Sequence, residues 1–120
     1  MKNVQIEKLS NSYTIRRLTD ADVSMLYAWM LRNDQYFRYC GGGTTPERVR
    51  QDLTLCPPGT APAQKHYVGF FDADTLVAVM DLIDGYPDAD TAFIGFFMVN
   101  KDLQGQGTGT AIVCDVLAAL

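Results

Sequence analysis

The feature that most constrains this chain is a short segment in which every second residue is glycine, placed between an apolar run and an apolar, helix-like stretch. Its glycines are Gly105, Gly107 and Gly109. Residues without side chains are needed where the backbone takes positive φ angles or approaches another group closely. A helix start also offers free amides and the positive end of the helix dipole, which favour an anion such as phosphate. The alternative is a tight strand-to-helix turn that serves packing alone.

Two common phosphate-binding motifs do not fit this segment. A dinucleotide fingerprint has the form G-x-G-x-x-G, but counting from Gly105 the third glycine position holds Thr110. A P-loop requires Gly-Lys-Ser/Thr, and no lysine follows Lys101. The segment also follows the last predicted strand, behind an antiparallel meander rather than inside an early βαβ unit. If the turn binds phosphate, it belongs to another class of site.

Hydrophobic periodicity and a helix cap predict the start of the fold. Residues 13–17 (YTIRR) are typical of a short strand. Thr19 then provides a helix cap, with the acidic Asp22 three residues later, a pairing that satisfies free amides at a helix start. Apolar residues follow at helical spacing and predict an amphipathic helix of about three turns. The predicted apolar stripe is Val23, Leu26, Tyr27, Met30 and Leu31.

A second, shorter helix is predicted from its start signals. Thr45 can cap it, and Pro46 suits the first helical position. Its apolar stripe is thin and consists of Val49, Leu53 and Cys56. Residues 59–65, rich in proline and alanine, then predict a mobile connecting loop without a packing role.

The second half of the chain is predicted to be three strands and a helix. Residues 66–72 (HYVGFFD) and 75–84 (TLVAVMDLID) predict a β-hairpin. Residues 91–99 (TAFIGFFMV) are almost continuously apolar, which predicts a central strand buried on both faces. The last helix spans residues 108–120. The resulting order, β-α-α-β-β-β-α, indicates an α+β fold.

The glycine segment also carries a family resemblance. Gln104-x-x-Gly107-x-Gly109 matches the Q/R-x-x-G-x-G/A signature, and the chain resembles the GCN5-related N-acetyltransferase (GNAT) family. The long apolar strand before the turn and the opening IRRLTDAD are similar to the family pattern too. The resemblance covers essentially the whole chain. It implies a single, incomplete GNAT-like (acyl-CoA N-acyltransferase) domain over residues 1–120, built on a mixed sheet.

The resemblance implies acetyl-coenzyme A (acetyl-CoA) as co-substrate, bound by the strand-turn-helix of residues 91–120. Main chain at the strand end would bind the pantetheine arm, here at Phe97, Met98 and Val99. A small-molecule or protein amine would then attack the thioester directly, as in an N-acetyltransferase. In the family, amides of the turn hold the pyrophosphate, which here implies Gln104, Gly105, Gln106, Gly107, Thr108, Gly109 and Thr110.

Candidate general bases are few. Asp81 and Asp84 lie near the end of one predicted strand, on opposite faces, so at most one of them can face the cleft. The alternative for each is a solvated carboxylate at a strand end or turn. His66, the only histidine, has an unperturbed pKa of about 6.5, suited to a base. Its place after a loose connector favours a surface position instead.

The segment after the first predicted helix is where the family builds part of its acceptor site. Tyr36, Phe37 and Tyr39 would line that pocket, and Arg38 would bind an anionic group. The alternative is that Phe37 and one tyrosine belong to the core while Arg38 is solvated. Both interpretations fit the residue types.

The resemblance also implies that family elements after residue 120 are absent: a further strand, a helix and two strands. The chain is then expected to be a C-terminally truncated domain. It would form a homodimer or pair with a separate C-terminal segment, because an open apolar strand edge invites pairing. Two alternatives remain beside the transferase, namely a catalytically inactive CoA-binding module and a self-assembling fragment that binds nothing.

Composition excludes several other classes. The chain has 120 residues, 48% hydrophobic residues and a net charge of −4, which indicates a globular domain without a nucleic-acid surface. Its three cysteines are scattered without metal-ligand spacing, so we expect reduced thiols and no metal. No apolar run approaches the roughly 18 residues of a membrane span. A cytoplasmic protein without a membrane partner is predicted.

Overall fold

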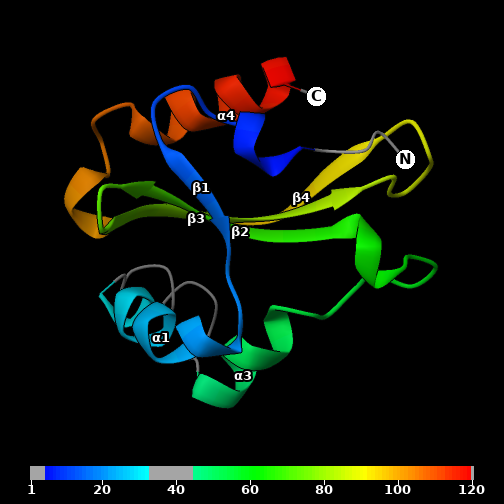
Figure 1. The fold of residues 1–120 in the computed structure, drawn as a ribbon, viewed down its shortest axis with the longest axis horizontal. Helices are drawn as coiled ribbons and strands as arrows, with labels where there is room; N and C mark the ends of the chain where they lie inside the picture. Colours follow the sequence, from blue (N-terminus) through cyan, green and yellow to red (C-terminus); the bar gives the residue numbers. More distant parts are fainter. Residues whose placement is uncertain (1–4, 33–44, 120) are drawn as a thin grey trace. The chain divides into compact units, whose positions relative to one another are not determined.

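A computed structural model describes residues 5–32 and 45–119 of the chain (Figure 1). Its helices and strands follow the predicted order. Contacts between residues divide the chain into two compact units, one of Leu18–Leu55 and one of Met1–Arg17 with Cys56–Leu120. Within the described ranges, no helix is long and apolar enough to cross a membrane.

The smaller unit contains the helices α1 (Val23–Leu31) and α3 (Pro46–Asp52). The predicted cap Thr45 begins α3, whereas the predicted cap Thr19 begins a short helix, η2 (Asp20–Asp22), that leads directly into α1. The Thr19 amide donates to the Asp22 carboxylate at 2.8 Å, before α1. The Thr45 hydroxyl accepts a hydrogen bond of 3.1 Å from the Arg48 amide in the first turn of α3. Local sequence chemistry therefore sets where each helix starts.

The apolar face of α1 differs from the prediction at two positions. Val23, Leu26 and Met30 are buried as expected, but Leu31 is 45% exposed and Trp29 is buried in its place. Val49 in α3 and Leu53, directly after its last residue, are buried. Cys56 lies beyond the end of α3 and belongs to the larger unit, so it is not the third member of the stripe.

The larger unit is built on one four-stranded sheet. The strands lie in the order β1-β2-β3-β4, and each of the three pairings is antiparallel, so the predicted meander is confirmed. The parallel pairing that a mixed sheet implies is not among the described strands. The strands are β1 (Thr14–Arg17), β2 (Lys65–Asp72), β3 (Thr75–Asp84) and β4 (Ala92–Val99).

Helix α4 (Thr108–Ala119) and the short helix η1 (Ile6–Lys8) cover one face of this sheet (Figure 1). Alternate strand residues point to that face and form its core with buried residues of α4. Its buried residues are all apolar, and Phe70 is the one aromatic residue among them. Its main members are Leu9, Val68, Phe70, Met80, Leu82, Ile112 and Val116.

Strand β4 was predicted to be central and buried on both faces, and this is wrong. It pairs with β3 on one side and has no strand among the described residues on the other. Of its eight residues only Met98 is buried, and Phe93 is 44% exposed. Strand β3 takes the central position, with eight of ten residues buried. Apolar content alone does not indicate which of two neighbouring strands is enclosed.

The predicted mobile connector, residues 59–65, is also more structured than expected. It contains the short helix η3 (Pro62–Gln64). The Gln64 side-chain amide donates to the carbonyls of Asp84 (2.9 Å) and Gly85 (3.2 Å), which fixes the connector to the end of β3. Lys65, assigned to the connector, is the first residue of β2 and is 7% exposed.

Candidate active site

The glycine turn between β4 and α4 uses its glycines in two ways. Gly105 and Gly107 have φ angles of +80° and +79°, in the left-handed region that side chains disfavour. A Cβ atom at either residue would meet nothing within 4 Å, so the backbone angle itself requires glycine there. At Gly109 a Cβ atom would lie 3.2 Å from Val99 Cγ2. Gly109 therefore allows α4 to pack closely against β4.

Side-chain amides hold this turn at its start. The Gln104 amide donates to the Val99 carbonyl at 3.0 Å, at the end of β4. Asn100, 6% exposed, donates to the Leu76 carbonyl at 3.0 Å and accepts from the Asp102 amide at 2.9 Å. The sequence assigned Asn100 only to a polar connector. Its position directly after a long apolar strand is the signal that was missed.

The turn ends at the free amides of α4. The first bond of the helix runs from the Ala111 amide to the Gly107 carbonyl, at 3.0 Å. The amides of Thr108, Gly109 and Thr110 precede that bond and have no acceptor in an earlier helical turn. Amides and helix dipole together favour an anion. After Lys65 the sequence has a single lysine or arginine, Lys101, which lies in the short helix η4 (Lys101–Leu103). An anion at the turn would therefore be bound by the main chain rather than by charged side chains.

The predicted pantetheine residues lie at the end of the edge strand. The side chains of Phe97 and Val99 pack toward the core under α4, and Met98 is buried on the other face. Because β4 lacks a described partner strand beyond it, the backbone groups of every second residue along this edge point away from β3. The edge therefore offers main-chain donors and acceptors beside the glycine turn.

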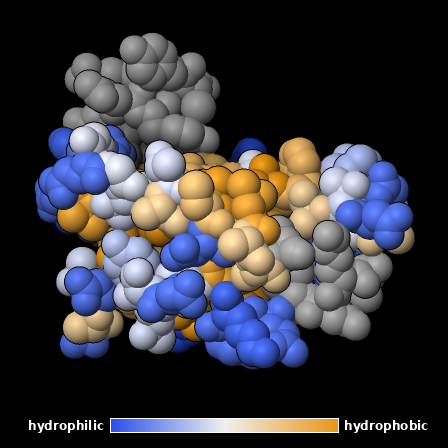
Figure 2. All heavy atoms as spheres, turned by 90° about the horizontal axis from the view of Figure 1, so that it is seen from above, coloured by the Kyte–Doolittle hydropathy of each residue, from blue (hydrophilic) through white to orange (hydrophobic). Residues whose placement is uncertain are grey.

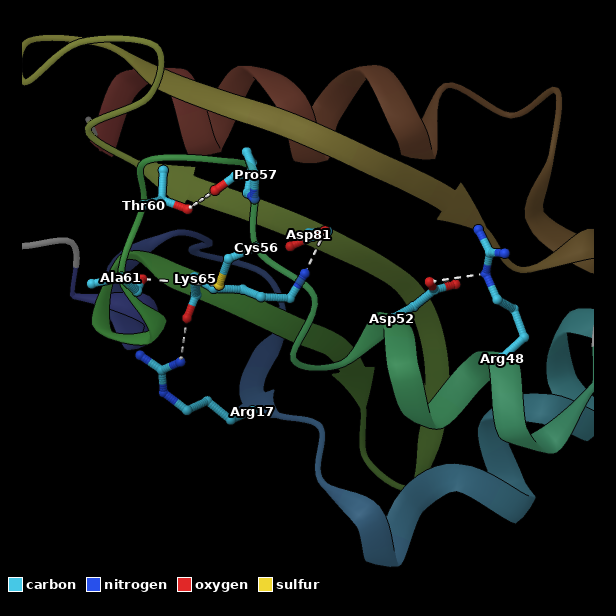
Figure 3. Close-up of polar contacts among 9 residues, drawn as sticks. All are labelled: Arg17, Arg48, Asp52, Cys56, Pro57, Thr60, Ala61, Lys65 and Asp81. Carbon is cyan, nitrogen blue, oxygen red and sulfur yellow. Dashed lines mark hydrogen bonds and ion pairs between the residues drawn. The ribbon is translucent and has the colours of Figure 1, made fainter.

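Asp81 lies on the sheet face away from α4 and forms an ion pair with Lys65 (Figure 3). The distance from Lys65 Nζ to Asp81 Oδ2 is 2.8 Å, and the two side chains are 5% and 16% exposed. The ammonium also lies 5.6 Å from the ring centre of Tyr67. A pair this enclosed has lost most of its hydration, so removing either partner would leave a costly unbalanced charge.

Asp84 lies on the opposite face, near His66. It is 2% exposed and pairs across the sheet with Ala92, which packs against the α4 core. His66 was predicted to be a surface residue, which is wrong, since it is 5% exposed within β2. Burial and the neighbouring Arg17 charge lower the pKa of His66, and Asp84 opposes this shift. A neutral, enclosed histidine bonded to Arg17 is a structural residue.

Comparison with known proteins identifies the family. The sequence matches the "Acetyltransferase (GNAT) family" over residues 28–120. This chain belongs to the GNAT acetyltransferases. The predicted family resemblance and α+β fold class are confirmed. No match was found among curated proteins.

The fold has a solved counterpart, an acetyltransferase from Thermus thermophilus. The two structures superimpose with a TM-score of 0.77 over 91% of this chain and 70% of the other, at 24% sequence identity. The similarity therefore extends across both units of the GNAT chain at the level of the fold.

The remaining predicted site residues divide into two groups. Tyr36, Phe37, Arg38 and Tyr39 lie outside the described residues. The residues predicted to bind the co-substrate lie together, at the end of β4 and in the turn that follows it. Among residues 5–32 and 45–119, no group of three or more His, Cys, Asp or Glu side chains is arranged to hold a metal ion.

Proposed function

We propose that this GNAT acetyltransferase transfers the acetyl group of acetyl-CoA to a primary amine. The observation that carries the proposal is the glycine turn, where positive φ at Gly105 and Gly107 leads directly into the free amides of α4. Such a turn suits a pyrophosphate, because its amides converge at the positive end of a helix dipole. The co-substrate is then held by the strand-turn-helix of residues 91–120.

In this proposal the turn binds pyrophosphate and the β4 edge binds the pantetheine arm. Main chain at Phe97, Met98 and Val99 hydrogen-bonds the arm, as a partner strand would. The carbonyl of Val99 is already bonded to the Gln104 side chain, so the arm uses other groups along the edge. The pyrophosphate contacts come from the main chain of Gln104, Gly105, Gln106, Gly107, Thr108, Gly109 and Thr110.

The proposed reaction is direct transfer. The amine nitrogen attacks the carbonyl carbon of the thioester, a C–N bond forms, the C–S bond breaks, and coenzyme A leaves as a thiolate that takes up a proton. Main-chain amides stabilise the developing oxyanion. Asp81 accepts the amine proton, because it is the more exposed of the two candidate carboxylates. Asp84 is the second candidate, although its burial beside His66 favours a structural role.

Calorimetric titration of acetyl-CoA tests the proposed co-substrate. Replacing Gly107 with valine should weaken binding by about tenfold or more, because the turn relaxes away from positive φ and must be strained again to bind. Gly59→Val is the matched control, since Gly59 has a similar φ of +82° and an equally open surrounding but lies outside the turn. Equal affinity in Gly107→Val and the wild type would refute the proposed phosphate site.

We further propose that the chain self-associates and works in the cytoplasm. Among the described strands β4 has a partner on one side only, and Leu117 on the outer side of α4 is 62% exposed. Figure 2 views the molecule from the side on which α4 lies and shows apolar side chains gathered across the middle of that face. A second copy, or a separate segment of the same family, suits this surface. Within the described residues Cys56 and Cys114 form no disulfide, which agrees with a reducing compartment.

A further inference from the structure

Gly95 leaves a gap in the side-chain layer on the sheet face away from α4. It lies in β4 where the pairing with β3 shifts register, next to the pair formed by Asp81 and Phe96. It is exposed, and its φ angle lies outside the left-handed region, so no backbone strain requires a glycine there. The absence of a side chain at this position therefore calls for another reason.

The groups around this gap are suited to an amino group. A Cβ atom at Gly95 would lie 3.5 Å from Asp81 Oδ2 and 3.5 Å from Phe93 Cε1. The carboxylate oxygen can accept a charge-assisted hydrogen bond from an amino group, and the aromatic ring offers an apolar surface to the carbon arm that carries it. The Phe93 ring is held in place by an edge contact with Tyr86, with ring centres 5.4 Å apart.

Lys65 sets the charge of this site. Its ammonium lies 2.8 Å from Asp81 Oδ2 and is almost fully enclosed, so the carboxylate is balanced from the buried side (Figure 3). An unbalanced carboxylate would stabilise the protonated amine, which has no lone pair and cannot attack a thioester. Because Lys65 balances the carboxylate, the site can bind the amine without stabilising its protonated, unreactive form. Lys65 is thus a positioning residue.

We propose that the gap at Gly95 is the subsite for the acceptor amino group, bounded by Asp81 and Phe93, so that the favoured acceptor is a primary amine on an apolar or aromatic arm. This inference rests on the proposed acetyl transfer and adds the acceptor class to it. The arm lies along the exposed Phe93 ring. Adding a methyl group at Gly95 would fill the space needed by the amino group.

Two-dimensional amide NMR of the full chain tests this proposal, because glycine amides are well separated in such spectra. Benzylamine, raised to about 20 mM to exceed the millimolar Kd typical of so small a ligand, should shift the Gly95 amide saturably. Methylamine, which lacks the aromatic arm, should bind several-fold more weakly. The Gly95→Ala variant has no glycine signal at this position, so benzylamine binding is followed through the amide shifts of Asp81 and Phe93. Its affinity should fall by about tenfold.

Charge variants give an independent test. Asp81→Asn should weaken benzylamine binding about tenfold through loss of a charged hydrogen bond, while Asp74→Asn, in the exposed turn before β3, should not change it. If Asp81→Asn does not fold, the test rests on Gly95→Ala, because the backbone conformation at residue 95 is one that alanine can adopt. No saturable shift at Gly95, or unchanged binding in Gly95→Ala, would overturn the subsite. Acetyl-CoA shifts at Gly105 and Gly107 in the same spectra test the co-substrate site separately.

Discussion

At the residue scale, His66 has a buried and well-defined environment. The Arg17 guanidinium hydrogen-bonds His66 Nδ1, and the same guanidinium donates to the Lys65 carbonyl at 3.2 Å. A guanidinium has donors only, so Nδ1 must accept and the ring proton lies on Nε2. Protonating the ring would place two cations in contact, which agrees with the lowered pKa of His66.

The first prediction concerns pH and stability. The unfolded chain protonates His66 near its ordinary pKa of 6.5, while burial and Arg17 lower that pKa in the folded chain. Stability is therefore fully retained above pH 6.5 and falls as the pH drops from 6.5 through the lower folded-state value, because the unfolded state then binds more protons. Denaturant unfolding at a series of pH values measures this effect.

The matched variant is His66→Asn, whose side-chain oxygen can still accept from Arg17 but does not titrate. Its free energy of unfolding should vary less between pH 7.5 and pH 5.5 than that of the wild type. Equal slopes in both proteins over that range would show that other groups cause the acid sensitivity.

At the element scale, the turn from β4 to α4 depends on Asn100. Asn100→Ala removes a buried donor to the Leu76 carbonyl and the acceptor of the Asp102 amide. We expect a loss of about 1–3 kcal/mol in the free energy of unfolding, together with weaker acetyl-CoA binding, because the turn loses its fixed start. Gln106→Ala, which removes one exposed hydrogen bond of 3.3 Å, should change stability by less than about 0.5 kcal/mol. Similar losses in both variants would contradict this role of Asn100.

The same scale shows what the sequence could and could not predict. The caps at Thr19, before η2, and at Thr45, before α3, were predictable, because a cap involves residues only three positions apart. The glycine turn was recognisable for the same reason. The edge position of β4 was not, since strand order depends on neighbours distant in the chain. His66 was assigned to the surface from its place after a loose connector, and its partner Arg17, 49 residues earlier, could not be recognised from the sequence.

The candidate site also contains residues that the sequence could predict and residues that it could not. The residues of the turn are contiguous, so a motif could find them, although the structure was needed to show which glycines take positive φ and which one allows close packing. Asp81 was a candidate from its residue type, but neither its partner Lys65 nor the gap at Gly95 could be foreseen. Both depend on the register of β3 with its two neighbours.

At the scale of the whole molecule, we expect the 120-residue chain to form dimers in solution. Leu117→Lys places a charge on the apolar outer side of α4 and should shift the equilibrium toward monomer, with at least about a tenfold rise in the dissociation constant. Leu55→Lys is the matched control, as Leu55 is also 62% exposed but belongs to the smaller unit. Light scattering over a range of concentrations measures the mass. A monomer at all concentrations would contradict self-association through this surface.

The fastening of the glycine turn has a consequence for binding. Asn100 and Gln104 hydrogen-bond its start to β3 and β4, and the φ angles of Gly105 and Gly107 are positive in the folded chain. A loop that must order itself on contact loses conformational entropy, which lowers affinity and slows association. Here that ordering is completed when the chain folds. In the proposed binding mode a phosphate group would meet a turn that is already ordered, so its affinity for the turn would depend on the stability of the fold itself.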